Sequence, residues 1–180
     1  MSTPTPLHPA VFFDRDGTLM HEVHYCGDPA KVVAIPGASA ALQRLREHGY
    51  RIIIITNQSG IGRGYFTVAQ FQAVQAELLR QLAPAQVDAS YYCPDHAEQT
   101  SARRKPSPAM IFEAEKDHAL DLARSFFIGD AATDIQCGKA AGVRTILVGT
   151  GYGARDAHCE PDFKAADVVE AVGRILSLTE

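Results

Sequence analysis

The chain has 180 residues with a formal net charge of −4, and 46% of them are hydrophobic. This hydrophobic fraction supports a full core, which excludes wholesale disorder, and the length is that of one domain. The acidic balance gives no positive field for nucleic acid, and no apolar run approaches membrane-spanning length, so we expect neither partner.

Residues 1–10 contain Pro, Ser and Thr but no cationic start and no apolar core. They predict a flexible tail rather than a secretory signal, followed by a single domain over residues 11–180. The four cysteines are scattered without a Cys-x-x-Cys pair, which favours a reducing, cytoplasmic setting. The sequence shows no large apolar stripe of the kind that would mark a contact between copies of the chain, so a monomer is the default expectation.

The first half of the chain alternates between strand and helix patterns. A short apolar run predicts a buried strand over residues 11–13, followed by an irregular stretch over 20–35. An amphipathic helix is predicted over 38–48, with Gly49 at its C-terminal end, and a second buried strand over 51–56. Thr67 is a suitable N-cap for a long helix over 68–82.

The second half continues the same alternation. Its predicted elements are a strand over 89–92, a helix from Pro108 to about residue 119, a strand over 125–128, a helix over 134–141, a strand over 143–148, and a helix over 168–178 that a very short strand could precede. This order predicts an α/β fold with a mainly parallel sheet and helices on both of its faces.

Two aspartates follow the first strand directly. Asp14 and Asp16 stand two residues apart, and Gly17 permits the chain to turn after them. Taken alone, Asp-x-Asp-Gly is also a common turn composition. At the carboxyl end of a parallel strand, however, one carboxylate could attack phosphorus as a nucleophile and the other could serve as general acid/base.

Polar residues also follow the later strands. Thr56 and Asn57 end the second strand, Lys105 follows the third, and Asp130 and Asp134 follow the fourth. The carboxyl ends of parallel strands meet at one edge of a sheet, so we expect these side chains to converge.

Convergence of several carboxylates requires a positive group among them. Oxygen ligands suit Mg²⁺, and the predicted ligands are Asp14, Asp16 and Asp130, with Asp14 and Asp130 as the side-chain ligands and Asp134 in support. Lys105 and the Thr56 hydroxyl would stabilise a transferring phosphoryl group. The predicted chemistry is phosphate ester hydrolysis through an aspartyl-phosphate on Asp14.

Four motifs resemble those of the haloacid dehalogenase-like phosphatases: Asp14-x-Asp16-Gly-Thr, Thr56-Asn57, Lys105-Pro106 and Gly129-Asp130-x-x-x-Asp134. Their wider context is similar to the D-glycero-D-manno-heptose 1,7-bisphosphate and histidinol-phosphate phosphatases. The resemblance implies a Rossmann-like three-layer sandwich closed by loops rather than by a cap domain. It also implies substrate contacts from Glu22, Tyr25, Thr56, Asn57, Gln58, Ser59, Arg104 and Lys105.

One element of that subfamily is incomplete in this chain. Many members hold a structural zinc in the loop after the third strand, through a Cys-x-His element and a later Cys-x-Cys. Here Cys93 is present, but Ser101 and Arg103 stand where the later cysteines would be. A closed structural zinc site needs four nitrogen or sulfur ligands, so no structural zinc is expected.

The leading hypothesis is therefore a Mg²⁺-dependent phosphatase that converts a heptose 1,7-bisphosphate to the 1-phosphate. A histidinol-phosphate phosphatase, a broader small-metabolite phosphatase and an inactive phosphosugar-binding protein remain alternatives. A phosphomutase would need a cap that excludes water. A receiver-like switch would have no use for an acid/base at Asp16.

Overall fold

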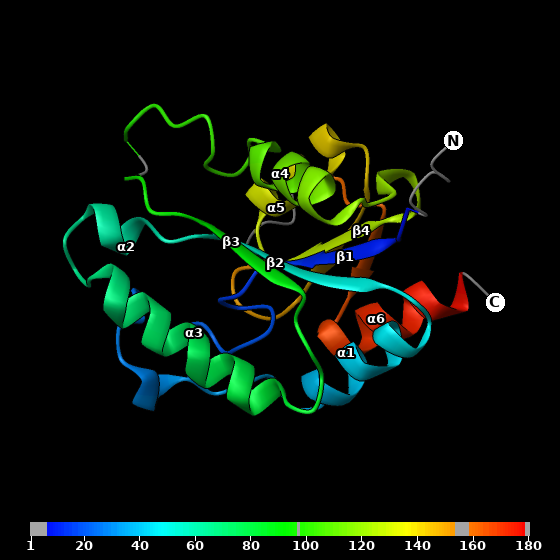
Figure 1. Ribbon diagram of the computed structural model, residues 1–180, viewed down its shortest axis with the longest axis horizontal. Helices are drawn as coiled ribbons and strands as arrows, with labels where there is room; N and C mark the ends of the chain where they lie inside the picture. The colour runs from blue at the N-terminus through cyan, green and yellow to red at the C-terminus, as the bar shows by residue number, and fades with distance from the viewer. Residues whose placement is uncertain (1–6, 97, 154–158, 179–180) are drawn as a thin grey trace, which may run out of the picture.

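The computed structural model describes residues 7–96, 98–153 and 159–178, and it has the predicted three-layer α/β architecture (Figure 1). Its sheet has six strands in the order β3-β2-β1-β4-β5-β6, and every neighbouring pair is parallel. The strands are β1 (Ala10–Phe13), β2 (Arg51–Asn57), β3 (Ala89–Cys93), β4 (Phe126–Gly129), β5 (Arg144–Val148) and β6 (Phe163–Ala165). The predicted fold class is confirmed, and β6 is the very short strand that the sequence allowed before the last helix.

Helices cover both faces of this sheet (Figure 1). One face carries α1 (Ala38–Glu47), α3 (Val68–Leu82) and α6 (Val168–Ser177), and the other carries α4 (Ala109–His118) and α5 (Ala132–Ala141). Alternate residues of β1 explain the division, because Phe13 packs into the first core and Phe12 into the second. Burial on both faces accounts for the unbroken apolar run of the central strands.

Several element ends differ by one or two residues from the predicted ones. Pro108 precedes α4 as its N-cap instead of standing inside it, and α5 begins at Ala132 rather than at Asp134. The short helices α2 (Ser59–Gly62), η1 (Pro29–Lys31) and η2 (Leu122–Arg124) were not predicted, since none is long enough to show a helical repeat. The capping box at Thr67 is present, with Gln70 as its partner.

The predicted tail lies mainly outside the described residues, which begin at Leu7. Its last residues belong to the folded part: His8 forms a β-bridge with Leu120, and Ala10 starts β1 one residue earlier than expected. The Ala10 amide donates a 2.8 Å hydrogen bond to the Ser125 hydroxyl, which secures the start of the strand. The division into a tail and one domain stays a prediction.

The carboxyl ends of β1, β2, β3 and β4 lie at the same edge of the sheet because all of these strands run in parallel. Residues 14–37, 94–96 and 98–108 form largely irregular loops at this edge, and no separate cap domain covers it in the described part of the chain. None of the helices described there is both long and apolar enough to cross a membrane.

Candidate active site

Asp14 stands at the carboxyl end of β1, where the chain leaves the sheet. Its amide donates a 3.0 Å hydrogen bond to the Ile128 carbonyl of β4, so its backbone is still tied to the neighbouring strand. Gly17 adopts a φ of +80°, which confirms the turn expected there. The Asp14 side chain is thereby held at the edge of the sheet, with only 11% of its surface exposed.

Lys105 reaches Asp14 from the loop after β3. Its Nζ lies 2.5 Å from Asp14 Oδ1 and 2.7 Å from Asp134 Oδ1, and it also donates to the Ile55 carbonyl. Burial disfavours the ammonium form, but the carboxylates of Asp134 and Asp14 outweigh this effect and raise the pKa of Lys105. The side chain is therefore a fixed buried cation.

Three buried carboxylates surround this point. Asp14, Asp130 and Asp134 each offer an oxygen, and the three oxygens lie within 4.8 Å of one another. Burial together with the neighbouring carboxylates raises the pKa of Asp14 well above its usual value, against the effect of Lys105. Burial, followed by the charge of Asp134, raises the pKa of Asp130 to about 7.

These properties fit a divalent cation bound by oxygen. Crowded carboxylates are costly when all are ionised, and a hard cation such as Mg²⁺ removes that cost. Of the three predicted metal ligands, Asp14 and Asp130 belong to the cluster. The Asp16 side chain does not, and Asp134 takes its place while also accepting a hydrogen bond from the Ala131 amide.

Asp16 is held apart from the cluster by a second network. The guanidinium of Arg15 donates to both oxygens of Asp16, at 2.9 and 3.0 Å, and Gln58 Nε2 donates to Oδ2 at 2.9 Å. Arg15 is fully buried and lies over the Phe71 ring. Sequence reasoning gave no role to Arg15; its position between the two aspartates was the available signal.

The Thr56 hydroxyl belongs to the same network. Gln58 Nε2 donates a 2.9 Å hydrogen bond to Thr56 Oγ1, which leaves the hydroxyl hydrogen available to a ligand. Thr56, like Lys105, is almost fully buried at the carboxyl edge of the sheet. The predicted convergence of Thr56, Lys105 and the aspartates is therefore seen in the structure.

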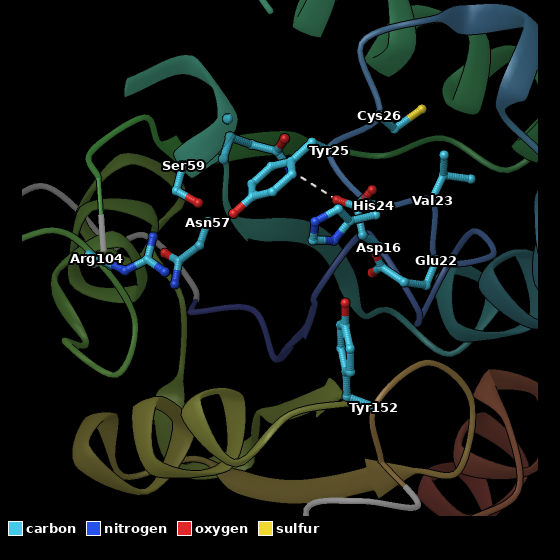
Figure 2. A pocket seen from close by; sticks show the side chains of 12 residues that line it. Asp16, Glu22, Val23, His24, Tyr25, Cys26, Asn57, Ser59, Arg104 and Tyr152 are labelled. Carbon is cyan, nitrogen blue, oxygen red and sulfur yellow. Dashed lines mark hydrogen bonds between the residues drawn. The ribbon is translucent and has the colours of Figure 1, made fainter. Parts of the chain in front are cut away.

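Two adjoining cavities open at this edge. The smaller, of about 190 Å³, is lined by Asp14, Thr56, Lys105 and Asp130 among others. The larger, of about 300 Å³, is not lined by the aspartate cluster and is shown in Figure 2. Both cavities are lined by Asp16, Glu22, Asn57, Arg104 and Tyr152, which form the boundary between them.

Two of the predicted substrate contacts, Thr56 and Lys105, line the smaller cavity, and the other six line the larger one. Its lining includes Glu22, Tyr25, Asn57, Gln58, Ser59 and Arg104. Burial and the Asp16 carboxylate raise the pKa of Glu22 to about 7. Tyr25 has a φ of 54°, unusual for a tyrosine, and its ring packs edge-on against Tyr65.

Two of these residues, Asn57 and Gln58, hold other residues of the site through side-chain hydrogen bonds. The Asn57 side chain donates to the Lys105 carbonyl at 3.2 Å and accepts from the Lys105 amide at 3.1 Å, so it fixes the backbone of that lysine. Gln58 is 5% exposed, and its amide bridges Arg15, Asp16 and Thr56. Both residues border the cavity and hold Lys105, Asp16 and Thr56 in place.

Tyr152 is a pocket residue that sequence reasoning missed. Its amide donates a 2.7 Å hydrogen bond to Asp130 Oδ2. Figure 2 shows its ring pointing toward Asp16 and Glu22 from the side of the pocket opposite Tyr25. A Gly-Tyr-Gly sequence after β5 was the available signal, because Gly151 allows close approach: a Cβ there would lie 2.0 Å from Asp130 Oδ2.

Comparison with known protein families supports the motif-based resemblance. A family model described as haloacid dehalogenase-like hydrolase matches residues 11–94, and a second, described as HAD-hydrolase-like, matches residues 102–175. Together these matches include both aspartates of the first motif, Lys105 and Asp130.

Comparisons with curated proteins and with solved structures point to one family within these hydrolases. The D-glycero-beta-D-manno-heptose-1,7-bisphosphate 7-phosphatase of Rhodopseudomonas palustris is 39% identical over 152 residues, covering 79% of this chain and 84% of the relative. The D-glycero-D-manno-heptose-1,7-bisphosphate 7-phosphatase of Thermosynechococcus vestitus is 38% identical over 183 residues, covering 91% of this chain and 93% of the relative. The crystal structure of the D,D-heptose 1,7-bisphosphate phosphatase from B. bronchiseptica, complexed with magnesium and phosphate, has a TM-score of 0.88 at 29% identity, covering 94% and 99%.

Proposed function

Because the chain belongs to the D-glycero-D-manno-heptose-1,7-bisphosphate 7-phosphatase family of haloacid dehalogenase-like hydrolases, we propose that it removes the 7-phosphate of such a heptose bisphosphate. One observation carries the mechanism. Asp14 lies in a buried carboxylate cluster against a fixed ammonium, whereas Asp16, two residues later, is held separately at the boundary of the two cavities. The two carboxylates have different environments and therefore different tasks.

Asp14 is the proposed nucleophile. A carboxylate oxygen of Asp14 attacks phosphorus, the bond from phosphorus to the sugar oxygen breaks, and an aspartyl-phosphate forms on Asp14. Lys105 favours the ionised form of Asp14 and stabilises the charge of the transferring group, and the free hydrogen of Thr56 is a further donor to that group.

Asp16 is the proposed general acid/base. It donates its proton to the departing sugar oxygen, and it then takes a proton from the water that cleaves the aspartyl-phosphate. The products are inorganic phosphate and the heptose 1-phosphate, which now has a free hydroxyl at C7, and Asp14 is regenerated. Arg15 and Gln58 fix the orientation of the Asp16 carboxylate for both transfers.

The proposed Mg²⁺ ligands are the side chains of Asp14 and Asp130, with Asp134 joining the cluster and anchoring Lys105. When bound by these residues, the ion would neutralise charge and orient the phosphate against the Asp14 carboxylate. Tyr152 and Ala131 restrain Asp130 and Asp134 through their backbone amides.

The larger cavity is the proposed site for the rest of the substrate. Arg104 supplies the charge for a second, distant phosphate, while Glu22, Tyr25 and Ser59 offer groups for sugar hydroxyls. A bisphosphate fits such an arrangement, with one phosphate beside Asp14 and the other reaching toward Arg104. We place this activity in the cytoplasm and in a monomer; the four free thiols support a reducing compartment.

The test is phosphate release from both anomers of D-glycero-D-manno-heptose 1,7-bisphosphate, from histidinol phosphate and from common sugar phosphates, with Mg²⁺ and with EDTA. Phosphorus NMR of the product identifies which phosphate has left. Mg²⁺-dependent loss of the 7-phosphate is the expected result. Preferential hydrolysis of histidinol phosphate would move the proposal to that substrate, and binding of the heptose bisphosphate without turnover would support an inactive binding protein.

A further inference from the structure

The loop between β3 and Lys105 carries Arg104, and it lacks a set of zinc ligands. The Cys93 thiol is followed in the loop by Ser101 and Arg103, which are not zinc ligands of the expected type. His96 Nδ1 already accepts the Glu98 amide at 3.1 Å. In the described part of the chain, the grouping suited to a metal ion is the aspartate cluster of the active site. The residues do not fit a closed zinc site.

A hydrogen-bonded group, here named the Ser101 clasp, occupies this position instead. It consists of Cys93, Asp95 and Ser101. The Ser101 hydroxyl donates to Asp95 Oδ2 at 2.5 Å, and the Cys93 thiol lies 3.5 Å from both Asp95 Oδ2 and Ser101 Oγ. The hydrogen bonds from Ser101 and Cys93 lower the pKa of Asp95, because they stabilise its ionised form.

The clasp extends directly to Arg104. Ser101 Oγ accepts the amides of Arg103 and Arg104, at 3.3 and 3.2 Å. A serine hydroxyl has one hydrogen and two lone pairs, so Asp95 and these two amides use its whole capacity. The Arg104 guanidinium also donates to the Asp95 carbonyl at 3.3 Å, which links both ends of this arginine to the clasp.

Arg103 secures the loop on its outer side. Its guanidinium makes a bidentate contact with Glu113 of α4, at 2.7 to 3.1 Å, and donates to the Tyr92 carbonyl at the end of β3. The loop is therefore tied to the sheet and to a helix without a metal.

Lys105 has supports of its own. The Asn57 side chain donates to the backbone carbonyl of Lys105 and accepts from its amide. Asp14, Asp134 and the Ile55 carbonyl contact its ammonium. Loss of the clasp should consequently affect Arg104 more than Lys105, and substrate binding more than the chemical step.

From these contacts we infer that Ser101 is a positioning residue that replaces a structural metal and sets the place of Arg104 at the substrate cavity. This inference rests on the proposed function insofar as Arg104 contacts the substrate. The hydrogen bonds of the clasp, in contrast, are testable without any substrate.

The first test compares Ser101→Ala with Ser101→Thr, which keeps the hydroxyl. Ser101→Ala is expected to raise KM for the heptose bisphosphate about fivefold with kcat changed less than about twofold, and Ser101→Thr to restore KM. Thr100→Ala removes a neighbouring exposed hydroxyl and is the matched control, with no change expected.

Two further measurements keep the test informative if Ser101→Ala folds poorly. Asp95→Ala should raise KM in the same direction, and the double variant should be no worse than Ser101→Ala, because both changes break one network. Amide hydrogen exchange at Arg103 and Arg104 should accelerate in Ser101→Ala but not in Ser101→Thr or Thr100→Ala.

Metal analysis tests the replacement directly. Purified protein should contain no stoichiometric zinc, and a zinc-selective chelator in excess Mg²⁺ should leave the unfolding midpoint unchanged. One zinc per chain that is lost in Cys93→Ser would overturn the inference, as would unaltered KM and unaltered amide exchange in Ser101→Ala. If the wild-type protein does not hydrolyse the heptose bisphosphate, the proposed function is wrong. Amide hydrogen exchange and zinc content would still test whether Ser101 holds this loop in place of a metal.

Discussion

The ammonium of Lys105 lies 2.5 Å from a carboxylate oxygen of Asp14, although 91 residues separate them in the chain. The same ammonium contacts Asp134 at 2.7 Å, so one buried cation faces two members of a three-carboxylate cluster. One ammonium cannot balance three ionised carboxylates, so the ionised cluster still favours a bound cation. Lys105 therefore contacts both the proposed nucleophile and the proposed metal site, so a change in one of these groups should affect the others.

Asp14→Asn should abolish turnover, with a fall of at least about a thousandfold, since an amide cannot form the aspartyl-phosphate. The fold should be retained, because Lys105 keeps Asp134 as its partner. Phosphate release and thermal unfolding are the two measurements. A residual rate within about tenfold of the wild type, in a preparation free of wild-type enzyme, would contradict the covalent route.

Lys105→Met should lower kcat by about a hundredfold to a thousandfold, because the transferring phosphoryl group loses a fixed positive charge. Without Mg²⁺ it should also destabilise the protein by about 3 kcal/mol, since removal of one partner leaves buried carboxylates uncompensated. Mg²⁺ should then raise the unfolding midpoint more in this variant than in the wild type. Lys139→Met, at an exposed position of α5, is the control and should change neither property.

Stability without Mg²⁺ should fall as the pH rises from about 4 to about 7. The pKa of Asp130 is raised from 3.8 to about 7 in the folded protein, so the folded state binds the proton more tightly than the unfolded chain does. Its contribution to stability is complete below the lower value and is lost as the pH rises through the upper one. Glu22, with a pKa raised to about 7, contributes with the same sign.

Mg²⁺ should reverse this dependence, because the ion competes with protons for the same carboxylates. Thermal unfolding between pH 4 and 8, with and without Mg²⁺, is the measurement; the stabilisation by Mg²⁺ should be small at low pH and largest above about 7. Asp130→Asn should weaken both trends. A Mg²⁺ effect of equal size at both ends of this range would argue against the aspartate cluster as the site of binding.

Gly17→Ala should reduce both stability and Mg²⁺ affinity. Gly17 has a φ of +80°, and a Cβ there would lie 2.4 Å from Asp130 Oδ2, so the substitution displaces a proposed metal ligand. Gly49→Ala is a matched control, because Gly49 has a φ of +82° with nothing within 4 Å of its Cβ position.

Both substitutions carry the backbone cost of the left-handed conformation, about 1 kcal/mol. Activity and Mg²⁺ titration should distinguish them: Gly49→Ala keeps the activity, and Gly17→Ala loses it. Equal Mg²⁺ affinity in the two variants would show that the contact with Asp130 is not needed for the metal site.

The sequence predicted the layers of the fold and much of the candidate site. Continuous apolar runs identified the central strands, and polar residues at their ends, from Asp14 to Asp130, predicted a common edge because parallel strands share a direction. These signals are local in the chain, since periodicity, caps and motifs require no knowledge of distant contacts.

Other features depend on contacts between distant segments. The roles of Arg15 and Gln58 around Asp16, the approach of Tyr152 to Asp130, and the arrangement of Ser101 with Asp95 all follow from how loops meet after folding. A hydrogen bond depends on distances of tenths of an ångström, which residue types alone do not specify. The amino-acid sequence by itself determined the kind of sheet and which groups gather at its edge. Only the tertiary structure decided which carboxylates share the buried cluster, and which residues hold them there, because both depend on how distant loops meet.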